Sequence, residues 1–160
     1  MRKADREIKD FNDIIGVLDR CQTIRLGLNG DEYPYVVPLS FGYEAADGAV
    51  TLYFHGATEG LKHELILKNN KVCVEADIFY RYTGTGHGIT TEYESVIGFG
   101  TIHKADTVEA IKGLELLLNH CRAGSASASD CVALGITAVY GIELERITGK
   151  RRFVEAGGQE

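Results

Sequence analysis

The chain contains no tryptophan, only two prolines and no long apolar run in its 160 residues. The longest nearly apolar stretch, residues 132–142, is interrupted by glycine and threonine. It falls far short of the ~20 residues that cross a bilayer. The opening residues, MRKADREIKDF, also lack the apolar segment of a secretory signal. We therefore expect a cytoplasmic protein with no membrane partner.

Cysteine and histidine show none of the spacings that mark metal sites. The four cysteines form no C-x-x-C pair, and the five histidines form neither H-x-x-x-H nor H-E-x-x-H. Without a secretory signal, disulfides are not expected either. The sequence therefore predicts reduced cysteines and no metal site.

Positive charge is also scarce, because 17 Lys and Arg residues face 23 Asp and Glu residues, giving a formal charge of −6. Proteins that bind nucleic acid usually carry a basic face, so this balance argues against a nucleic-acid partner. It leaves room for a local basic pocket that binds a phosphate. The hydrophobic content of 44% is typical of a globular chain. We expect a single domain over residues 1–160.

The hydrophobic periodicity predicts a mainly β protein with peripheral helices. Nineteen glycines indicate many tight turns between strands. Helices are expected at about 5–20, at 61–69 and from Asp106, and strands at 23–28, 34–41, 50–55, 72–77, 92–103 and 132–145. Short links between most strands predict an antiparallel barrel rather than a βαβ succession. We expect the C-terminal tail, 148–160, to be flexible.

Several motifs are absent or incomplete. The glycine-rich stretch 80–91 (YRYTGTGHGITT) is not G-x-G-x-x-G, and no helix follows it, so it predicts a hairpin or loop rather than a dinucleotide site. Neither Ser40 nor Ser95 lies in a G-x-S-x-G elbow, which argues against a hydrolase. Pro38 cannot donate a hydrogen bond, so we expect an irregular position in its strand where a ligand could meet the backbone.

The most informative segment is LYFHGATEGLK, residues 52–62. A strand is expected to end at His55, and a helix to begin near Gly60. Backbone N–H groups at that helix start, beside the ammonium of Lys62, would suit a phosphate. Gly56 and Ala57 would let a flat ligand approach closely. The alternative is an ordinary turn followed by a solvated lysine on an amphipathic helix.

Three blocks in order carry a family resemblance: PYVVPLSFGYE, LYFHGATEGLKHELILKNNKVCVEAD and YESVIGFGTIHKADTVEAI. With them, the chain resembles the flavin-binding split-barrel family related to pyridoxamine 5′-phosphate oxidase, and within it the nitroimidazole-resistance (Nim-type) branch. The resemblance covers about residues 1–118, followed by a final strand and a T-G-K tail, Thr148-Gly149-Lys150.

The resemblance implies a six-stranded antiparallel split barrel that binds flavin mononucleotide (FMN) at a homodimer interface. The flavin ring would be lined by Val36, Val37, Pro38, Leu39 and Ser40. The ring and ribityl chain would lie beside His55, Gly56 and Ala57. The phosphate would be held by Gly60, Leu61 and Lys62, chiefly Lys62. The other subunit would contribute Ser95, Val96 and Ile97.

Two positions depart from the family pattern. Leu61 stands where a second basic residue is common, so Arg25, Arg151 or Arg152 would have to compensate. Ser40 replaces a common asparagine, which removes one polar contact to the ring.

The implied activity is reduction of a small electron-poor acceptor, as in a nitroreductase, with NAD(P)H as the donor. His55 is the candidate for substrate contact or proton supply, because its ordinary pKa lies near neutrality; the alternative is a histidine that only packs against the cofactor. Two other functions remain open: a non-catalytic flavin- or haem-binding module of the same fold, and a structural dimer without cofactor.

Overall fold

The computed structural model describes residues 3–86, 88–123 and 137–154. Its strands form one antiparallel sheet of eight members, and three α-helices lie outside it. The strands are β1 (Glu7–Ile8), β2 (Ile24–Leu28), β3 (Tyr35–Leu39), β4 (Gly42–Ala46), β5 (Ala49–Ala57), β6 (Lys71–Thr85), β7 (Gly88–Lys104) and β8 (Thr137–Arg152). The helices are α1 (Phe11–Arg20), α2 (Leu61–Lys68) and α3 (Thr107–His120), with a 3-10 turn at Ala4–Arg6.

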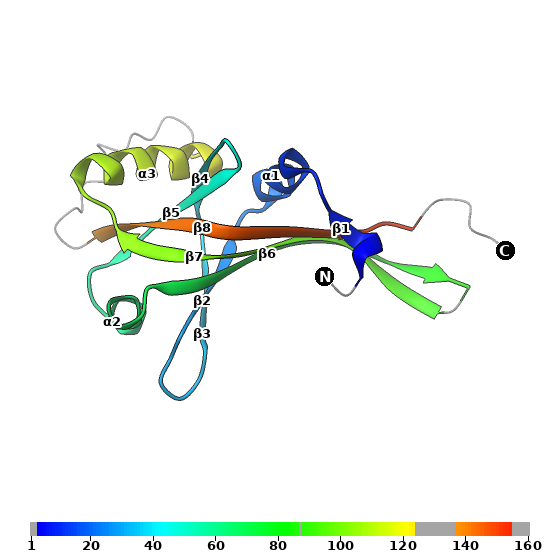
Figure 1. The fold of residues 1–160 in the computed structure, drawn as a ribbon, viewed down its shortest axis with the longest axis horizontal. Coiled ribbons are helices and arrows are strands. Elements are labelled where there is room, and N and C mark those ends of the chain that lie inside the picture. The colour runs from blue at the N-terminus through cyan, green and yellow to red at the C-terminus, as the bar shows by residue number, and fades with distance from the viewer. Residues whose placement is uncertain (1–2, 87, 124–136, 155–160) are drawn as a thin grey trace.

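The connection between β3 and β4 forces the sheet to curl. The strand order is β3-β2-β6-β7-β8-β5-β4, with β1 added to β8, so β3 and β4 stand at opposite ends. Only Ser40 and Phe41 separate these two strands in the sequence. So short a link spans about 10 Å at most, and both ends of the sheet must therefore lie close together. The result is the barrel-like arrangement in Figure 1, with α1 and α3 on one side of the strands and α2 on the other.

The core lies inside this curled sheet. Alternate residues of the strands point inward, among them Leu26, Val74 and Val96, and the rings of Phe54 and Tyr140 stack with centroids 5.1 Å apart. Helix α1 contributes Val17 and Leu18 to the same core. The mainly β antiparallel architecture expected from the sequence is confirmed, as are the helices α2 and α3.

The N-terminal helix is shorter than expected. It begins at Phe11, because the carboxylate of Asp10 accepts hydrogen bonds from the backbone N–H groups of Asn12 and Asp13 and so caps the helix. The preceding residues, Glu7–Ile8, form strand β1 instead and pair with β8. Two residues are too few to produce a recognisable alternation, so the sequence pattern did not reveal this strand.

The tail is ordered further than expected. Residues Thr148–Arg152 belong to β8 and pair with β7, for example Lys150 with Ser95. The expectation of a flexible tail is therefore wrong for this part, because pairing with β7 on one side and β1 on the other holds it. Residues 155–160 of the tail, and 132–136 of the expected last strand, lie outside the described residues.

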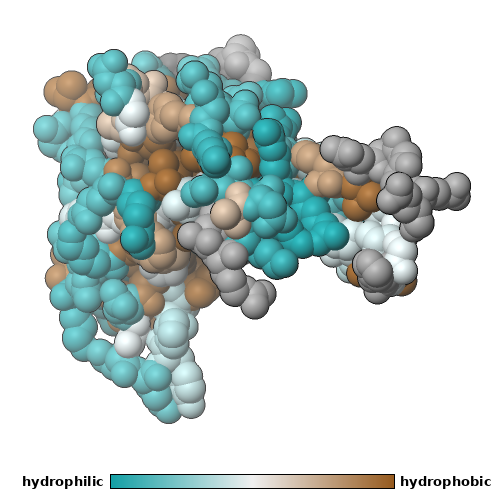
Figure 2. Space-filling view, turned by 45° about the vertical axis from the view of Figure 1, so that its right-hand side comes forward, coloured by the Kyte–Doolittle hydropathy of each residue, from teal (hydrophilic) through white to brown (hydrophobic). Residues whose placement is uncertain are grey.

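The strand count is eight instead of six because the pattern missed β1 and also β4, whose residues GYEAA alternate only weakly. The glycine-rich stretch is no loose excursion, since β6 and β7 pair out to Thr85 and Gly88. This hairpin projects from the barrel in Figure 1. Its exposed residues include Tyr82 and Ile89, and its projecting end is white to brown in Figure 2.

Candidate functional site

Five adjacent strands present one continuous surface, which we call the outer sheet face. Strand register places side chains of β3, β2, β6, β7 and β8 in rows across it. One row is Val36, Gly27, Cys73, Phe99 and Arg146, and the next is Pro38, Arg25, Glu75, Ile97 and Thr148. Val36 is 60% exposed, Ile97 41% and Phe99 40%. Exposed apolar side chains in register are unusual for a free surface, so this face is a candidate binding surface.

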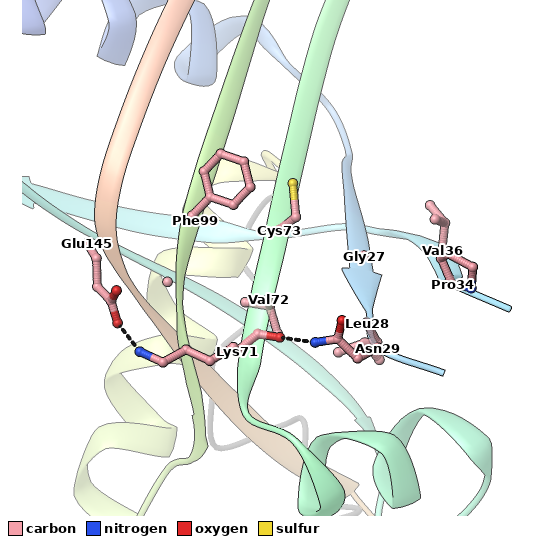
Figure 3. A pocket seen from close by; sticks show the side chains of 11 residues that line it. Gly27, Leu28, Asn29, Pro34, Val36, Lys71, Val72, Cys73, Phe99 and Glu145 are labelled. Atoms are coloured by element: carbon pink, nitrogen blue, oxygen red, sulfur yellow. Dashed lines mark hydrogen bonds and ion pairs between the residues drawn. The ribbon is translucent and has the colours of Figure 1, made fainter. Parts of the chain in front are cut away.

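A groove of about 560 Å³ lies on this face, between β3 and β7. Gly27 of β2 and Gly100 of β7 both line it, and Gly27, in register with Val36 and Cys73, adds no side chain to its floor. A Cβ atom on Gly100 would lie 2.1 Å from the carbonyl oxygen of Glu143, so only glycine fits at that position. Figure 3 shows Phe99 and Cys73 side by side on neighbouring strands, with Val36 across the groove on β3.

One end of the groove is polar. The ammonium of Lys71 donates hydrogen bonds to the carboxylate of Glu145 and, at 3.0 Å, to the hydroxyl of Thr101. The side-chain amide of Asn29 donates to the carbonyl of Lys71 at 3.1 Å, which ties the end of β2 to the start of β6 (Figure 3). The groove therefore combines an apolar middle with a fixed polar end, as small-molecule sites usually do.

A second hollow, of about 380 Å³, lies on the same face over β7 and β8, and we call it the basic pocket. Phe99 lines both hollows. The residues that line the basic pocket are Glu7, Ser95, Ile97, Phe99, Arg146, Thr148 and Lys150.

The outer sheet face brings together only alternate members of the residues predicted to contact the flavin ring. Val36, Pro38 and Ile97 lie on the face, and Ser95 lines the basic pocket. Their neighbours Val37, Leu39 and Val96 turn into the core. A ligand on this face could therefore reach these three only through their backbone, because successive side chains of a strand point to opposite sides.

Pro38 causes no register shift. It pairs with Arg25 between regular neighbours on β3. Strand β3 is an edge strand, where a missing N–H group is tolerated. Ser40 is exposed in the short link that follows.

The second predicted group gathers around Lys62. Gly60 precedes α2 with a φ of 97°, a left-handed value that favours glycine. From the first turn of α2, Lys62 folds back over β5, with its ammonium 5.1 Å from the ring centroid of Phe54. A Cβ atom built on Gly56 would lie 2.7 Å from the ammonium, so Gly56 provides the room for it. Partial burial lowers the pKa of Lys62.

Lys62 has no carboxylate within ion-pair distance in the part of the chain that the structure describes, unlike Lys68 of the same helix, which pairs with Asp31. A half-buried ammonium without a counter-ion suits a bound anion. Leu61 is 54% exposed beside it and cannot contribute a charge.

His55 and Ala57 are exposed on β5, in register with Val139 and Thr137 of β8. They flank Gly56 and point to the side of the strand opposite to it. Across the described residues, no hydrogen bond joins His55 to the Lys62 group or to the outer sheet face. The roles predicted for these residues stay predictions.

Two of the three arginines considered as replacements for a basic residue at position 61 are already engaged. The guanidinium of Arg25 donates to Glu75 at 3.0 Å and to Asp77 at 2.6 Å. Arg151 lies 3.4 Å from the carboxylate of Asp13. Ligand binding by either would first have to break these ion pairs.

Two buried carboxylates escaped the sequence analysis. Glu94 accepts hydrogen bonds from Arg20 and, at 2.7 Å, from the hydroxyl of Tyr80. Glu92 accepts from the Nε of Arg81 at 2.7 Å and from the backbone N–H of Val154 at 3.0 Å. These bonds fasten the base of the projecting hairpin to α1 and to the C-terminal residues. In the sequence, the two glutamates stand at alternate positions of a strand. This pattern is typical of an exposed strand face, so it did not reveal that they are buried.

The hydrogen bond from Arg81 lowers the pKa of Glu92. Because the folded state favours the ionised carboxylate, this stabilisation is present at neutral pH and is lost as the pH falls through the lowered pKa. We expect Glu92→Gln to lower the melting temperature at pH 7 and to flatten its decrease in acid. The exposed Glu115→Gln is the control. Identical melting curves of Glu92→Gln and wild type between pH 3 and 7 would contradict this prediction.

The described residues contain no group of three or more His, Cys, Asp or Glu side chains that could hold a metal ion. None of the helices described is both long and apolar enough to cross a bilayer.

Residues 10–151 match the sequence family described as pyridoxamine 5′-phosphate oxidase. The structure resembles that of a candidate 5-nitroimidazole antibiotic resistance protein from Bacteroides thetaiotaomicron, with a TM-score of 0.79 and 28% identity over 90% of this chain and 85% of that one. A search of curated proteins gives no match.

Two further structures share the fold at lower identity. The FAD and haem binding protein from Mycobacterium smegmatis has a TM-score of 0.78 and 17% identity, over 93% of this chain and 74% of that one. The flavocytochrome Anf3 from Azotobacter vinelandii has a TM-score of 0.76 and 17% identity, over 96% and 72%. The family match spans most of the sequence and confirms the resemblance carried by the three motif blocks, so the chain belongs to the pyridoxamine 5′-phosphate oxidase family and has its split-barrel fold.

Proposed function

We propose that this chain is an FMN-binding oxidoreductase that works as a homodimer and reduces a small electron-poor acceptor with NAD(P)H. The single observation that carries the proposal is Lys62, a half-buried ammonium that has no counter-ion among the described residues and lies against Gly56 in a chain of this family. The similar protein from Mycobacterium smegmatis binds FAD and haem, which supports a flavin site.

The residues present fit a flavin. Lys62 would hold the phosphate, because Gly56 leaves space beside its ammonium and no carboxylate among the described residues competes for it. We favour FMN over FAD as the cofactor. The single lysine suits the one phosphate group of FMN, and Leu61 adds no second charge for the two phosphate groups of FAD. The bound flavin would supply the electron transfer, while this chain orients the ring and excludes water. His55 is the candidate for contact with the acceptor.

A second copy of the chain would cover the outer sheet face. Val36, Ile97 and Phe99 are exposed there, and Figure 3 shows the open groove that Val36 and Phe99 border. Burying such side chains stabilises association by about 25 cal/mol per Å² of apolar area. Ser95 and Ile97 of one copy would then lie at the flavin of the other. Sedimentation analysis should give a dimer, and a monomer at micromolar concentration would contradict this assembly.

The visible absorption spectrum of the purified protein tests the cofactor. We expect flavin bands, release of FMN on denaturation and bleaching when NADH or NADPH is added without oxygen. Chromatography of the released flavin distinguishes FMN from FAD. A colourless protein that takes up neither flavin would overturn the proposal and favour a structural dimer.

A non-catalytic module of the same fold is the second candidate, supported by the similarity to the FAD and haem binding protein from Mycobacterium smegmatis. A flavin that NAD(P)H does not reduce, or a haem Soret band in its place, would select it.

A further inference from the structure

The T-G-K motif near the end of the chain shapes the basic pocket. Thr148 and Lys150 point outward from β8 into the pocket, while Gly149 between them faces inward. A Cβ atom on Gly149 would lie 2.8 Å from the Cγ1 of Ile14 and 3.0 Å from the Cβ of Ile8. The glycine therefore lets β1 and α1 pack closely behind the strand, and the motif holds two outward side chains at fixed positions.

Two cations line this pocket, and neither has a carboxylate partner among the residues that the structure describes. The guanidinium of Arg146 lies over Phe99, with its Cζ 4.6 Å from the ring centroid, and the ammonium of Lys150 lies 5.8 Å from the ring centroid of Tyr93. Across residues 3–86, 88–123 and 137–154, no carboxylate comes within ion-pair distance of either cation. Arg20, Arg25, Lys71 and Arg81 all have such partners. In a chain of net charge −6, two unpaired cations in one hollow are an uncommon arrangement.

The other lining groups complete a site for an anion attached to an apolar ring. Ser95 offers a hydroxyl at the register position opposite Lys150. The hydroxyl of Thr148 donates to the carbonyl of Ile97 at 3.3 Å, which fixes that wall. Ile97 and Phe99 supply exposed apolar surface.

Glu7 is the only acidic residue among those that line the pocket. Glu75 and Asp77 are the register partners of Ile97 and Ser95 on β6, but both are bound to Arg25. These two carboxylates therefore have a cation of their own, and among the described lining residues Glu7 is the one that opposes an incoming anion.

We propose that the basic pocket binds a flat anionic ligand, with Arg146 and Lys150, four residues apart on β8, as the candidate cationic contacts and Ile97 between them under the apolar part of the ligand. Charge-assisted hydrogen bonds from such cations are the usual means of binding a carboxylate or phosphate. The ligand is the electron donor or acceptor of the flavin, an identity that rests on the proposed function. The basic pocket is separate from the Lys62 site. Lys62 lies against β5, and β5 pairs with β8 only as far as Glu143, before β8 reaches Arg146 and Lys150.

Equilibrium calorimetry with para-nitrobenzoate and its neutral analogue para-nitrobenzamide tests the pocket. The wild-type protein should bind the benzoate more tightly. In the double variant Arg146→Ala/Lys150→Ala, we expect the benzoate to bind about tenfold more weakly or worse, because two charged donors are lost, and the benzamide to bind unchanged. Lys112→Ala removes a positive charge from α3, away from the pocket, and should leave both affinities as they are.

A second variant tests the charge in the opposite direction. Glu7→Gln removes the opposing carboxylate and should strengthen binding of the benzoate alone. Equal affinity of the wild-type protein for the two compounds, including no detectable binding of either, would overturn the proposal. So would an unchanged benzoate affinity in the double variant, or weaker binding in Glu7→Gln.

The preference of the enzyme for NADPH or NADH shows which ligand carries the anionic group. A preference for NADPH over NADH that the double variant abolishes assigns the pocket to the donor's phosphate, whereas an unaltered preference assigns it to the acceptor. The calorimetry needs no flavin. If the protein proves colourless and binds no flavin, the proposed function fails while the pocket is still tested by the two nitro compounds.

Discussion

The Lys62→Ala variant is expected to bind FMN at least about tenfold more weakly than the wild type. A hydrogen bond to a charged group contributes about 1.5–3 kcal/mol, and tenfold in affinity corresponds to about 1.4 kcal/mol. The loss should be large here because Lys62 is half-buried beside Gly56 and the adjacent Leu61 carries no charge that could replace it. Quenching of flavin fluorescence on binding measures the dissociation constant.

Riboflavin, which lacks the phosphate, separates the phosphate contact from general damage to the site. Its affinity should be the same in wild type and Lys62→Ala. Lys68→Ala, on the same helix but paired with Asp31 at the surface, is the matched control and should leave FMN binding unaltered. Equal weakening of riboflavin and FMN would show that Lys62 supports the fold rather than the phosphate.

The same lysine should reduce stability when no flavin is bound. Burial lowers its pKa, which means that the folded state disfavours the ammonium. The folded protein should therefore gain stability as the pH rises toward the ordinary lysine pKa. Lys62→Met should raise the melting temperature of the flavin-free protein at pH 7 while lowering its affinity for FMN. A melting temperature below that of the wild type would contradict this exchange of stability for binding.

Gly42→Ala is expected to cause the largest loss of stability, about 3 kcal/mol or more. A Cβ atom at this position would lie 2.2 Å from the backbone nitrogen of Leu117 and 2.4 Å from the carbonyl carbon of Leu116. Both atoms belong to the backbone of α3, so the helix as a whole would have to move away from β4. Overpacking against side chains costs about 1–3 kcal/mol, and a rigid helix yields less than side chains do. Urea denaturation measures the change in free energy.

Gly84→Ala is the matched control, because it makes the same substitution in a strand where nothing lies within 4 Å of the added atom. Its free energy of unfolding should stay within about 1 kcal/mol of the wild-type value. If Gly42→Ala were as stable as Gly84→Ala, the close approach of α3 to β4 would be wrong.

The sequence was informative wherever a local pattern sufficed. Residues 61–69 and those from Asp106 showed helical spacing, and α2 and α3 formed there. The lack of a long apolar run predicted no membrane-spanning helix, the acidic balance argued against a nucleic-acid partner, and the ordered motif blocks led to the family that residues 10–151 match. The segment around Gly56 and Lys62 was identified because strand end, small residues and helix start follow one another within a few positions.

The tertiary structure decided what depends on register between distant strands. Val36, Ile97 and Arg146 are far apart in the sequence, and only the pairing of β2, β6, β7 and β8 puts them on one face. The pairing also divided runs such as 36–40 into outward and inward residues. Likewise, Arg25 and Arg151 are engaged by carboxylates from other elements, whereas Arg146 and Lys150 have no such partner in the described part of the chain. Local periodicity indicates which residues prefer burial. Which residues share a binding surface also depends on which strands lie next to each other.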